Sequence, residues 1–363
     1  MNNSRRLILG LVGLIVLSGL PGCRIKGYMV PLIVKGELDK MKTQKAHEVE
    51  NYAEVLLGEA TEEVNFTVRY SPPSRYRYEY RPVGEGSEVI LCVSDTYYTL
   101  YSPGIKQMIQ VVGLPSFADS TFTEFRKKAL YTALRYNQAE VIDDPADPKK
   151  YWKLITQPNA DSPWQMSSES YIVKDSRNNV RIIEKDSSGN VIGRFETLKK
   201  SFDVNFTDDL FTIHPTEDTT VWTFDLSTGS PMSEYQGQRG RKLPAAFEGL
   251  NLSRFQESPE QALFDYTTRQ MVLFYAQILH ENRPVLRSPV RREISLNGTL
   301  AAVSYAGYYS TCTWRSDEWE HLIFTTLGPE VAITLAQTLL ASPVTSAQEN
   351  QTGQTPLKVS ELP

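Results

Sequence analysis

Side chains that could do chemistry occur in this chain, but none stands in a spacing that catalysis uses. Only four histidines are present, and they are far apart: His47, His214, His280 and His321. The sequence has no nucleophile elbow, no Ser-x-x-Lys, no Cys-x-x-Cys, no phosphate-binding glycine loop and no His-Glu-x-x-His. Ser94 and Cys92 have no evident neighbouring base, and a nucleophile needs a partner within hydrogen-bond reach. We therefore predict a non-enzymatic protein without a cofactor.

Three carboxylates close together could ligate calcium. Asp143, Asp144 and Asp147 lie in a stretch interrupted by prolines. They lack the glycine and the distal glutamate of a calcium-binding loop. We predict a solvated turn here and no metal site.

Cys23 is the one residue with a specific chemical role. Arg5 and Arg6 precede an apolar run that ends at Leu20-Pro21-Gly22-Cys23, the pattern of an export signal that is too short for a comfortable membrane span. The segment resembles a bacterial lipobox, which implies cleavage before Cys23, diacylglycerol on its sulfur and an amide-linked chain such as palmitate. Acyl chains contribute about 0.8 kcal/mol per buried methylene to membrane binding. An uncleaved N-terminal anchor is the alternative.

Either form of the anchor places the globular part on the extracytoplasmic face of a bacterial membrane. This is the cell membrane, or an outer membrane where one exists. The formal net charge is -5 and basic residues are dispersed, which excludes a nucleic-acid-binding protein. Cys92 and Cys312 lie in apolar, strand-like runs, so we expect buried thiols rather than a disulfide.

About 340 residues remain after processing, enough for two domains. We predict a signal peptide over 1–22, a lipidated tether over 23–36, a first domain over 37–226, a linker over 227–242, a second domain over 243–341 and a disordered tail over 342–363. Helical spacing predicts amphipathic helices over 37–58 and 121–134. Alternation and turn residues predict strands in the first domain over 64–70, 75–81, 88–94, 97–101, 151–155, 170–174, 180–185, 191–199, 202–206 and 221–226.

The second domain has its own strand and helix signals. Strands are predicted over 270–279, 292–296, 300–305, 310–314 and 319–325. Asn297-Gly298 is the strongest hairpin signal in the chain. Pro329 at a first helical position begins a terminal helix over 330–340.

Three segments of the first domain carry a resemblance to a known family. Residues 66–80, with a proline before alternating basic and aromatic residues, look like the second-strand entry of LolA-like proteins. Residues 94–104 are similar to the next hairpin of that family, and residues 208–215 resemble its late segment, where a Phe closes the barrel. The resemblance implies an α+β fold: an incomplete antiparallel β-barrel covered by helices. The additional small C-terminal sheet with a terminal helix resembles the two-domain layout of RseB-like envelope regulators.

The concave face of the incomplete barrel is the candidate ligand-binding site. Its candidate lining residues are Tyr76, Tyr78, Tyr80, Leu91, Val93, Tyr98, Leu100, Phe122 and Phe125. These residues could equally be core beneath the helix that carries Phe122 and Phe125. Two functions stay open: an anchored lipoprotein that binds a lipid, acyl chain or other hydrophobic ligand, and a protein-interaction or regulatory lipoprotein, RseB-like or sporulation-associated, whose cavity is filled.

Overall fold

The structure is a computed structural model. It describes residues 45–84, 86–94, 96–114, 137–231, 246–247, 249–268, 271–279, 291–305, 309–316 and 319–342, and residues 30, 32, 33, 35, 36 and 39. Cys23, the predicted helix over 121–134 and nearly all of the predicted tail lie outside this set. No helix among the described residues is long and apolar enough to cross a membrane.

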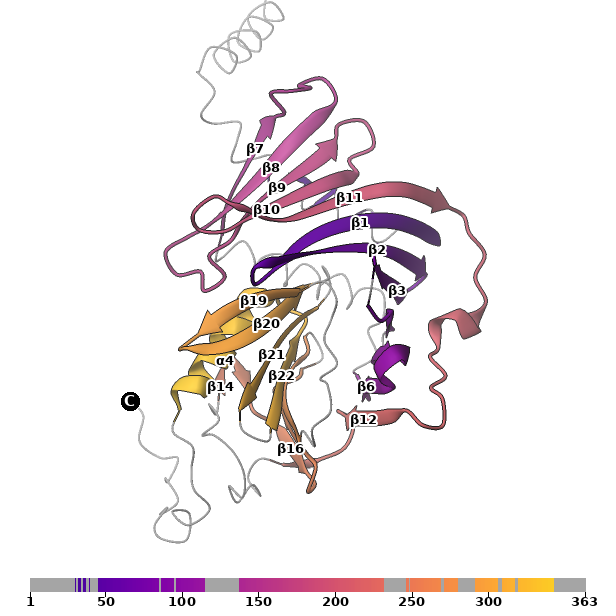
Figure 1. Cartoon of the computed structure of the whole chain (residues 1–363), viewed down its shortest axis with the longest axis vertical. Helices are drawn as coiled ribbons and strands as arrows, with labels where there is room; N and C mark the ends of the chain where they lie inside the picture. The colour runs from indigo at the N-terminus through magenta and orange to yellow at the C-terminus, as the bar shows by residue number, and fades with distance from the viewer. Residues whose placement is uncertain are drawn as a thin grey trace, which may run out of the picture.

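Most of the described first unit is one large sheet of twelve strands (Figure 1). Its strands are β1 (His47–Leu57), β2 (Ala60–Ser71), β3 (Arg75–Pro82), β4 (Val89–Val93), β5 (Tyr97–Ser102), β6 (Gln107–Val112), β7 (Asn137–Asp143), β8 (Tyr151–Pro158), β9 (Ser167–Val173), β10 (Asn179–Lys185), β11 (Val191–Phe202) and β12 (Thr220–Asp225). They lie in the order β12-β6-β5-β4-β3-β2-β1-β11-β10-β9-β8-β7. Neighbours are antiparallel except β12 and β6, which are parallel. The sheet is not closed, as predicted for an incomplete barrel.

The predicted helix over 37–58 is wrong for residues 47–57, which form strand β1. This strand pairs with β2 from His47–Tyr70 to Leu57–Ala60, and Gly58 closes the turn with a φ of +60°. Ala53 and Val55 are fully buried, and their spacing of two is that of a strand. The apolar residues Tyr52, Ala53, Leu56 and Leu57 fit the spacing of a helix equally well. Pairing with long strands on both sides, β2 and β11, decides the outcome.

Other differences from the sequence prediction concern strand number. Strands β6 and β7 were not predicted. The strand predicted over 202–206 is wrong: Phe202 ends β11, and Asp203 has a φ of +56°, which breaks the extended backbone.

The second unit is a sheet of eight described strands followed by one helix. The strands are β13 (Ser230–Pro231), β16 (Arg254–Glu257), β17 (Gln261–Asp265), β18 (Leu273–Leu279), β19 (Arg291–Leu296), β20 (Thr299–Tyr305), β21 (Ser310–Ser316) and β22 (Trp319–Thr325), in the order β13-β16-β17-β18-β22-β21-β20-β19. A short separate pair is formed by β14 (Ala246–Phe247) and β15 (Leu250–Asn251). Strands β16 and β17 were not predicted. Helix α4 (Pro329–Ala341) begins at Pro329 as predicted.

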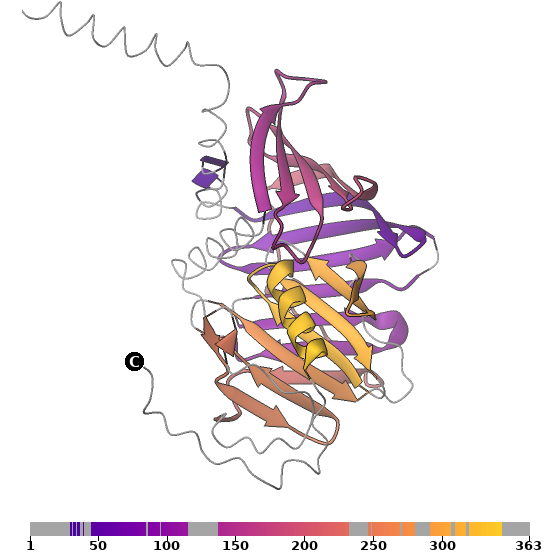
Figure 2. The same ribbon diagram turned by 90° about the vertical axis from the view of Figure 1, so that its left-hand side faces the viewer.

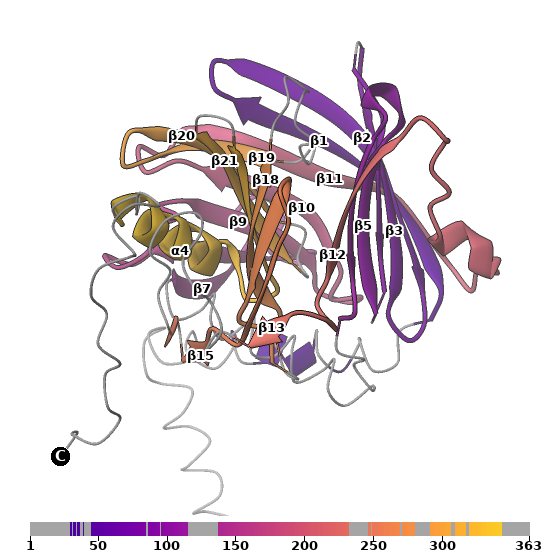
Figure 3. The same ribbon diagram turned by 90° about the horizontal axis from the view of Figure 1, so that it is seen from below.

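The large sheet curves around the second sheet. From below, the second sheet stands between the β3–β5–β12 side of the large sheet and helix α4 (Figure 3). The side view has the same layers, with α4 across the outer face of the second sheet (Figure 2). One hydrophobic cluster joins both sheets and α4, with Tyr80, Leu91 and Phe224 from the first unit and Phe274, Phe324 and Leu335 from the second. The two units therefore share a core.

Candidate functional site

Seven of the predicted lining residues lie together on one face of the large sheet, which we call the tyrosine face. These are Tyr76, Tyr78, Tyr80, Leu91, Val93, Tyr98 and Leu100. Strand pairing places Tyr76 opposite Val93, Tyr78 opposite Leu91, Leu91 opposite Leu100 and Val93 opposite Tyr98. Directly opposed residues share a face of the sheet. On β3 the ring of Tyr78 stacks on those of Tyr76 and Tyr80, each with 6.2 Å between the ring centroids.

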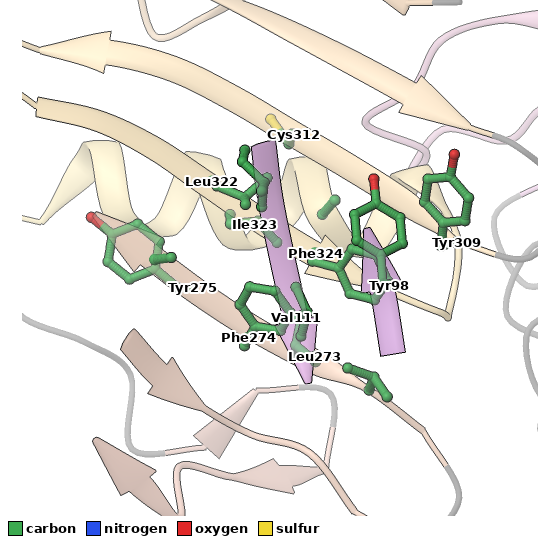
Figure 4. Packing of buried hydrophobic residues seen from close by; sticks show 14 of the residues in the cluster. Tyr98, Val111, Leu273, Phe274, Tyr275, Tyr309, Cys312, Leu322, Ile323 and Phe324 are labelled. Atoms are coloured by element: carbon green, nitrogen blue, oxygen red, sulfur yellow. The ribbon is translucent and has the colours of Figure 1, made fainter. Parts of the chain in front are cut away.

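The second sheet packs directly on the tyrosine face (Figure 4). The ring of Tyr98 lies 4.7 Å from that of Phe324 and 5.1 Å from that of Tyr309, measured between centroids. All members of the face except the partly buried Val93 are at most 6% exposed. In this structure the face is therefore core, and strands of the second unit form the contact.

Burial also keeps the hydroxyls of Tyr80 and Tyr98 in the neutral form. It raises the pKa of Tyr80 and Tyr98 well above the ordinary value. The hydroxyls are therefore neutral at physiological pH and act as hydrogen-bonding groups. Phe122 and Phe125 lie outside the described residues, and ligand binding by the whole predicted set stays a prediction.

A different part of the inner face, across β8, β10 and β11, is less covered. Leu154 and Ile182 both oppose Ser170, and Ile182 opposes Phe195, so the three apolar side chains share one face. All three are only partly buried. The sequence did not single them out, because their strands lack the alternating aromatic residues that mark β3.

Arg292 of β19 connects the second unit to this region. Its Nη2 lies 2.6 Å from Glu184 Oε2, and its guanidinium carbon lies 6.0 Å from the centre of the Phe195 ring. Arg292 is 5% exposed. A Cβ atom on Gly193 would lie 1.9 Å from Nη2, so a glycine at this point of β11 makes room for the guanidinium.

The outer face of β2 and β3 carries a half-buried ion network. Glu79 Oε1 accepts from Arg77 Nε at 2.7 Å and lies 2.9 Å from Arg69 Nη1. Burial alone would raise the pKa of Glu79, but its bonds with Arg69 and Arg77 outweigh that effect and lower the pKa. We interpret this network as structural, because it joins neighbouring strands and is neutralised by its own arginines.

Both described cysteines are free and buried, as expected from the sequence. Burial raises the pKa of Cys92 to about 11, so its thiol is not a nucleophile at neutral pH. No group of three or more metal-ligating side chains occurs in the described ranges.

His321, one of the four histidines that are far apart along the chain, has partners on neighbouring strands. It hydrogen-bonds Tyr275 on one side and Ser316 on the other. Tyr275 is distant in sequence, so spacing along the chain could not have indicated the cluster.

No protein-family model matches the sequence, and no curated protein matches it. Among solved structures, the chain is similar to MucB of Pseudomonas aeruginosa, solved with MucA, at 13% identity and a TM-score of 0.40 over 85% of this chain and 96% of that chain. It is also similar to LolA superfamily protein NE2245 from Nitrosomonas europaea, at 10% identity and a TM-score of 0.26 over 50% of this chain and 97% of that one.

A putative outer membrane lipoprotein-sorting protein domain from Vibrio parahaemolyticus matches at 9% identity and a TM-score of 0.28, over 49% of this chain and 94% of that one. The neighbours include both groups that the sequence motifs resemble. The predicted resemblance to LolA-like and RseB-like proteins is confirmed. At these identities and TM-scores the likeness carries nothing about function.

Proposed function

We propose that this chain is a lipoprotein of the bacterial envelope, held on the extracytoplasmic face of a membrane through Cys23, and that it binds a partner protein. The observation that carries the proposal is the packing of the second sheet onto the tyrosine face. A carrier of acyl chains needs an apolar face that its ligand can reach. Here Phe324 and Tyr309 of the same chain already contact that face.

An exposed apolar side chain of the second unit gives a partner a point of contact. Leu300, near the start of β20, is 62% exposed. Large apolar and aromatic side chains at the surface are typical anchors of protein interfaces. The surface near Leu300 is therefore where we expect the partner to bind.

A hydrophobic ligand is the second candidate, favoured by the partly buried side chains of Leu154, Ile182 and Phe195. A ligand there would lie beside Arg292 and away from the tyrosine face. In this second candidate function the chain is again a binding protein, but it binds a hydrophobic ligand, not a protein, and it does so on the large sheet.

Site-specific photo-crosslinking in cells tests the partner proposal. A photoreactive residue at position 300 is compared with one at position 198, because Leu198 is equally exposed (60%) but lies in the first unit. We expect one defined crosslinked protein from position 300 and none from position 198. Equal crosslinking at both positions would contradict the proposed surface.

Lipid analysis of the whole Cys23→Ser chain separates the second candidate. We expect native mass spectrometry to find no bound acyl lipid. Stoichiometric lipid that disappears in a folded Phe195→Glu variant would instead establish the hydrophobic-ligand function.

A further inference from the structure

The face of the second sheet that points away from the tyrosine face holds a buried polar cluster. Pairing places His321 opposite both Trp314 and Gln277, and Tyr275 precedes Gln277 by two residues on the same face. Ser316 is two residues from Trp314 on β21, so the two side chains lie on the same face. The cluster thus draws on three adjacent strands, β18, β21 and β22.

Both ring nitrogens of His321 are engaged. Nε2 lies 2.5 Å from Ser316 Oγ, and Nδ1 lies 2.8 Å from the Tyr275 hydroxyl. Gln277 Nε2 donates to the same hydroxyl at 2.7 Å. His321, Tyr275 and Gln277 are at most 4% exposed, whereas Ser316, at the end of its strand, is only partly buried.

The imidazole is also held rigidly in its plane. Its ring stacks on Trp314 at 4.8 Å with 8° between the planes, and on Tyr275 at 6.0 Å with 3°. A base that is buried, oriented by a third group and hydrogen-bonded to an accessible hydroxyl has the arrangement that activates a serine nucleophile.

We propose that Ser316 and His321 form a nucleophile–base pair that cleaves activated carboxylic esters. Tyr275 acts as a positioning residue through Nδ1 of His321. This activity is independent of the proposed partner binding, and it departs from the non-enzymatic protein expected from the sequence.

The reaction balances with the ester and water as its only reactants. The Ser316 proton passes to His321 Nε2 while Oγ forms a bond to the carbonyl carbon. The bond from that carbon to the alcohol oxygen then breaks, and the alcohol takes the proton from Nε2. Water repeats both steps, releasing the carboxylic acid and restoring Ser316.

The chemistry of Tyr275, the residue that positions His321, determines which esters the pair can cleave. Tyr275 is a neutral phenol, and it stabilises an imidazolium less than the carboxylate of a serine protease does. The pair is therefore a weak activating system, and it suits esters whose leaving alcohol is acidic, such as p-nitrophenyl acetate.

The test is labelling of the full chain, purified in mild detergent, by a fluorescent fluorophosphonate, with the labelled residue mapped by peptide mass spectrometry. We expect label on Ser316, none in Ser316→Ala, and unchanged labelling in Ser295→Ala, an exposed serine of the same sheet. The labelling rate in His321→Gln should fall at least about 100-fold, the usual effect of losing a general base.

Tyr275→Phe keeps the stacked ring, and it is the variant to test if His321→Gln does not fold. It should lower the labelling rate about tenfold, the effect of one lost hydrogen bond, and shift the pH dependence of labelling. Absence of label on Ser316 in the folded chain overturns the proposal. An unchanged rate in a folded His321→Gln chain, or in Tyr275→Phe if the first variant does not fold, also overturns it and leaves the cluster as a structural element of the core.

Discussion

The contact of Arg292 with Glu184 and Gly193 makes an unusual stability prediction. Replacing Gly by Ala at a strand position with ordinary φ normally stabilises a protein by about 0.5–1 kcal/mol, because the unfolded chain loses freedom. At Gly193, however, the new Cβ would lie 1.9 Å from Arg292 Nη2. The guanidinium must move, which separates it from Glu184. We therefore expect Gly193→Ala to destabilise.

The magnitude follows from the burial of the two charges. Breaking a fully buried ion pair costs about 3–5 kcal/mol. The Arg292 side chain is 6% exposed but that of Glu184 is 25% exposed, so water can solvate the carboxylate that remains. We expect Gly193→Ala and Arg292→Met each to lower the free energy of unfolding by about 2–3 kcal/mol.

Urea unfolding of the two single variants and the double variant checks this reasoning. Since Met lacks the guanidinium, Gly193→Ala should cost nothing further in the Arg292→Met chain, and it should be neutral or stabilising there. The double variant is then at least about 2 kcal/mol more stable than the sum of the two single effects. Additive losses would refute the argument, because they would mean that the alanine acts on something other than Arg292.

Three further predictions follow from the anchor, the linker and the ion network. Cys23→Ser should leave an uncleaved precursor that takes up no labelled fatty acid; equal labelling of variant and wild type would exclude acylation of Cys23. Limited proteolysis of the folded chain should cut first within 227–242 and leave two protected fragments, whereas first cuts between Val64 and Leu100 would contradict the proposed domains. The lowered pKa of Glu79 means that its stabilisation is complete above its unfolded value of 4.5 and is lost as the pH falls through the lower folded value. Urea unfolding from pH 6 downwards should therefore show a steeper loss of stability in wild type than in Glu79→Gln, and parallel curves would contradict this.

Alternation along the chain was enough to predict most strands of both sheets and the shared face of Tyr76, Tyr78 and Tyr80. It failed at β1, where Leu56 and Leu57 beside Tyr52 and Ala53 fit a helix as well as a strand. Local pattern could not decide this case, because the strand is held by partners up to about 150 residues away, in β11.

The cover of the tyrosine face could not be predicted for a related reason. Phe324 and Tyr309 belong to the second unit, and nothing in their own segments indicates which surface they contact. The cluster around His321 is similar in part, since Tyr275 reaches the imidazole only when β18 lies beside β22, whereas Ser316 is close to His321 through the β21–β22 hairpin. Spacing rules find sites built within one segment, but the contact with Tyr275 depends on tertiary packing.

The second sheet packs on the tyrosine face, and a double-mutant cycle between Tyr98 and Phe324 tests this packing most directly. Their ring centroids are 4.7 Å apart at 66°, and such aromatic pairs contribute about 0.5–1.5 kcal/mol beyond buried area. Phe264→Leu is the control, because Phe264 is equally buried but stacks on Tyr275 at the opposite face. We predict a coupling free energy of about 1 kcal/mol between Tyr98→Leu and Phe324→Leu, and additivity within about 0.5 kcal/mol between Tyr98→Leu and Phe264→Leu. Two results together would contradict the packing of the second sheet on the tyrosine face: no coupling between Tyr98 and Phe324, and separate unfolding transitions for the two sheets.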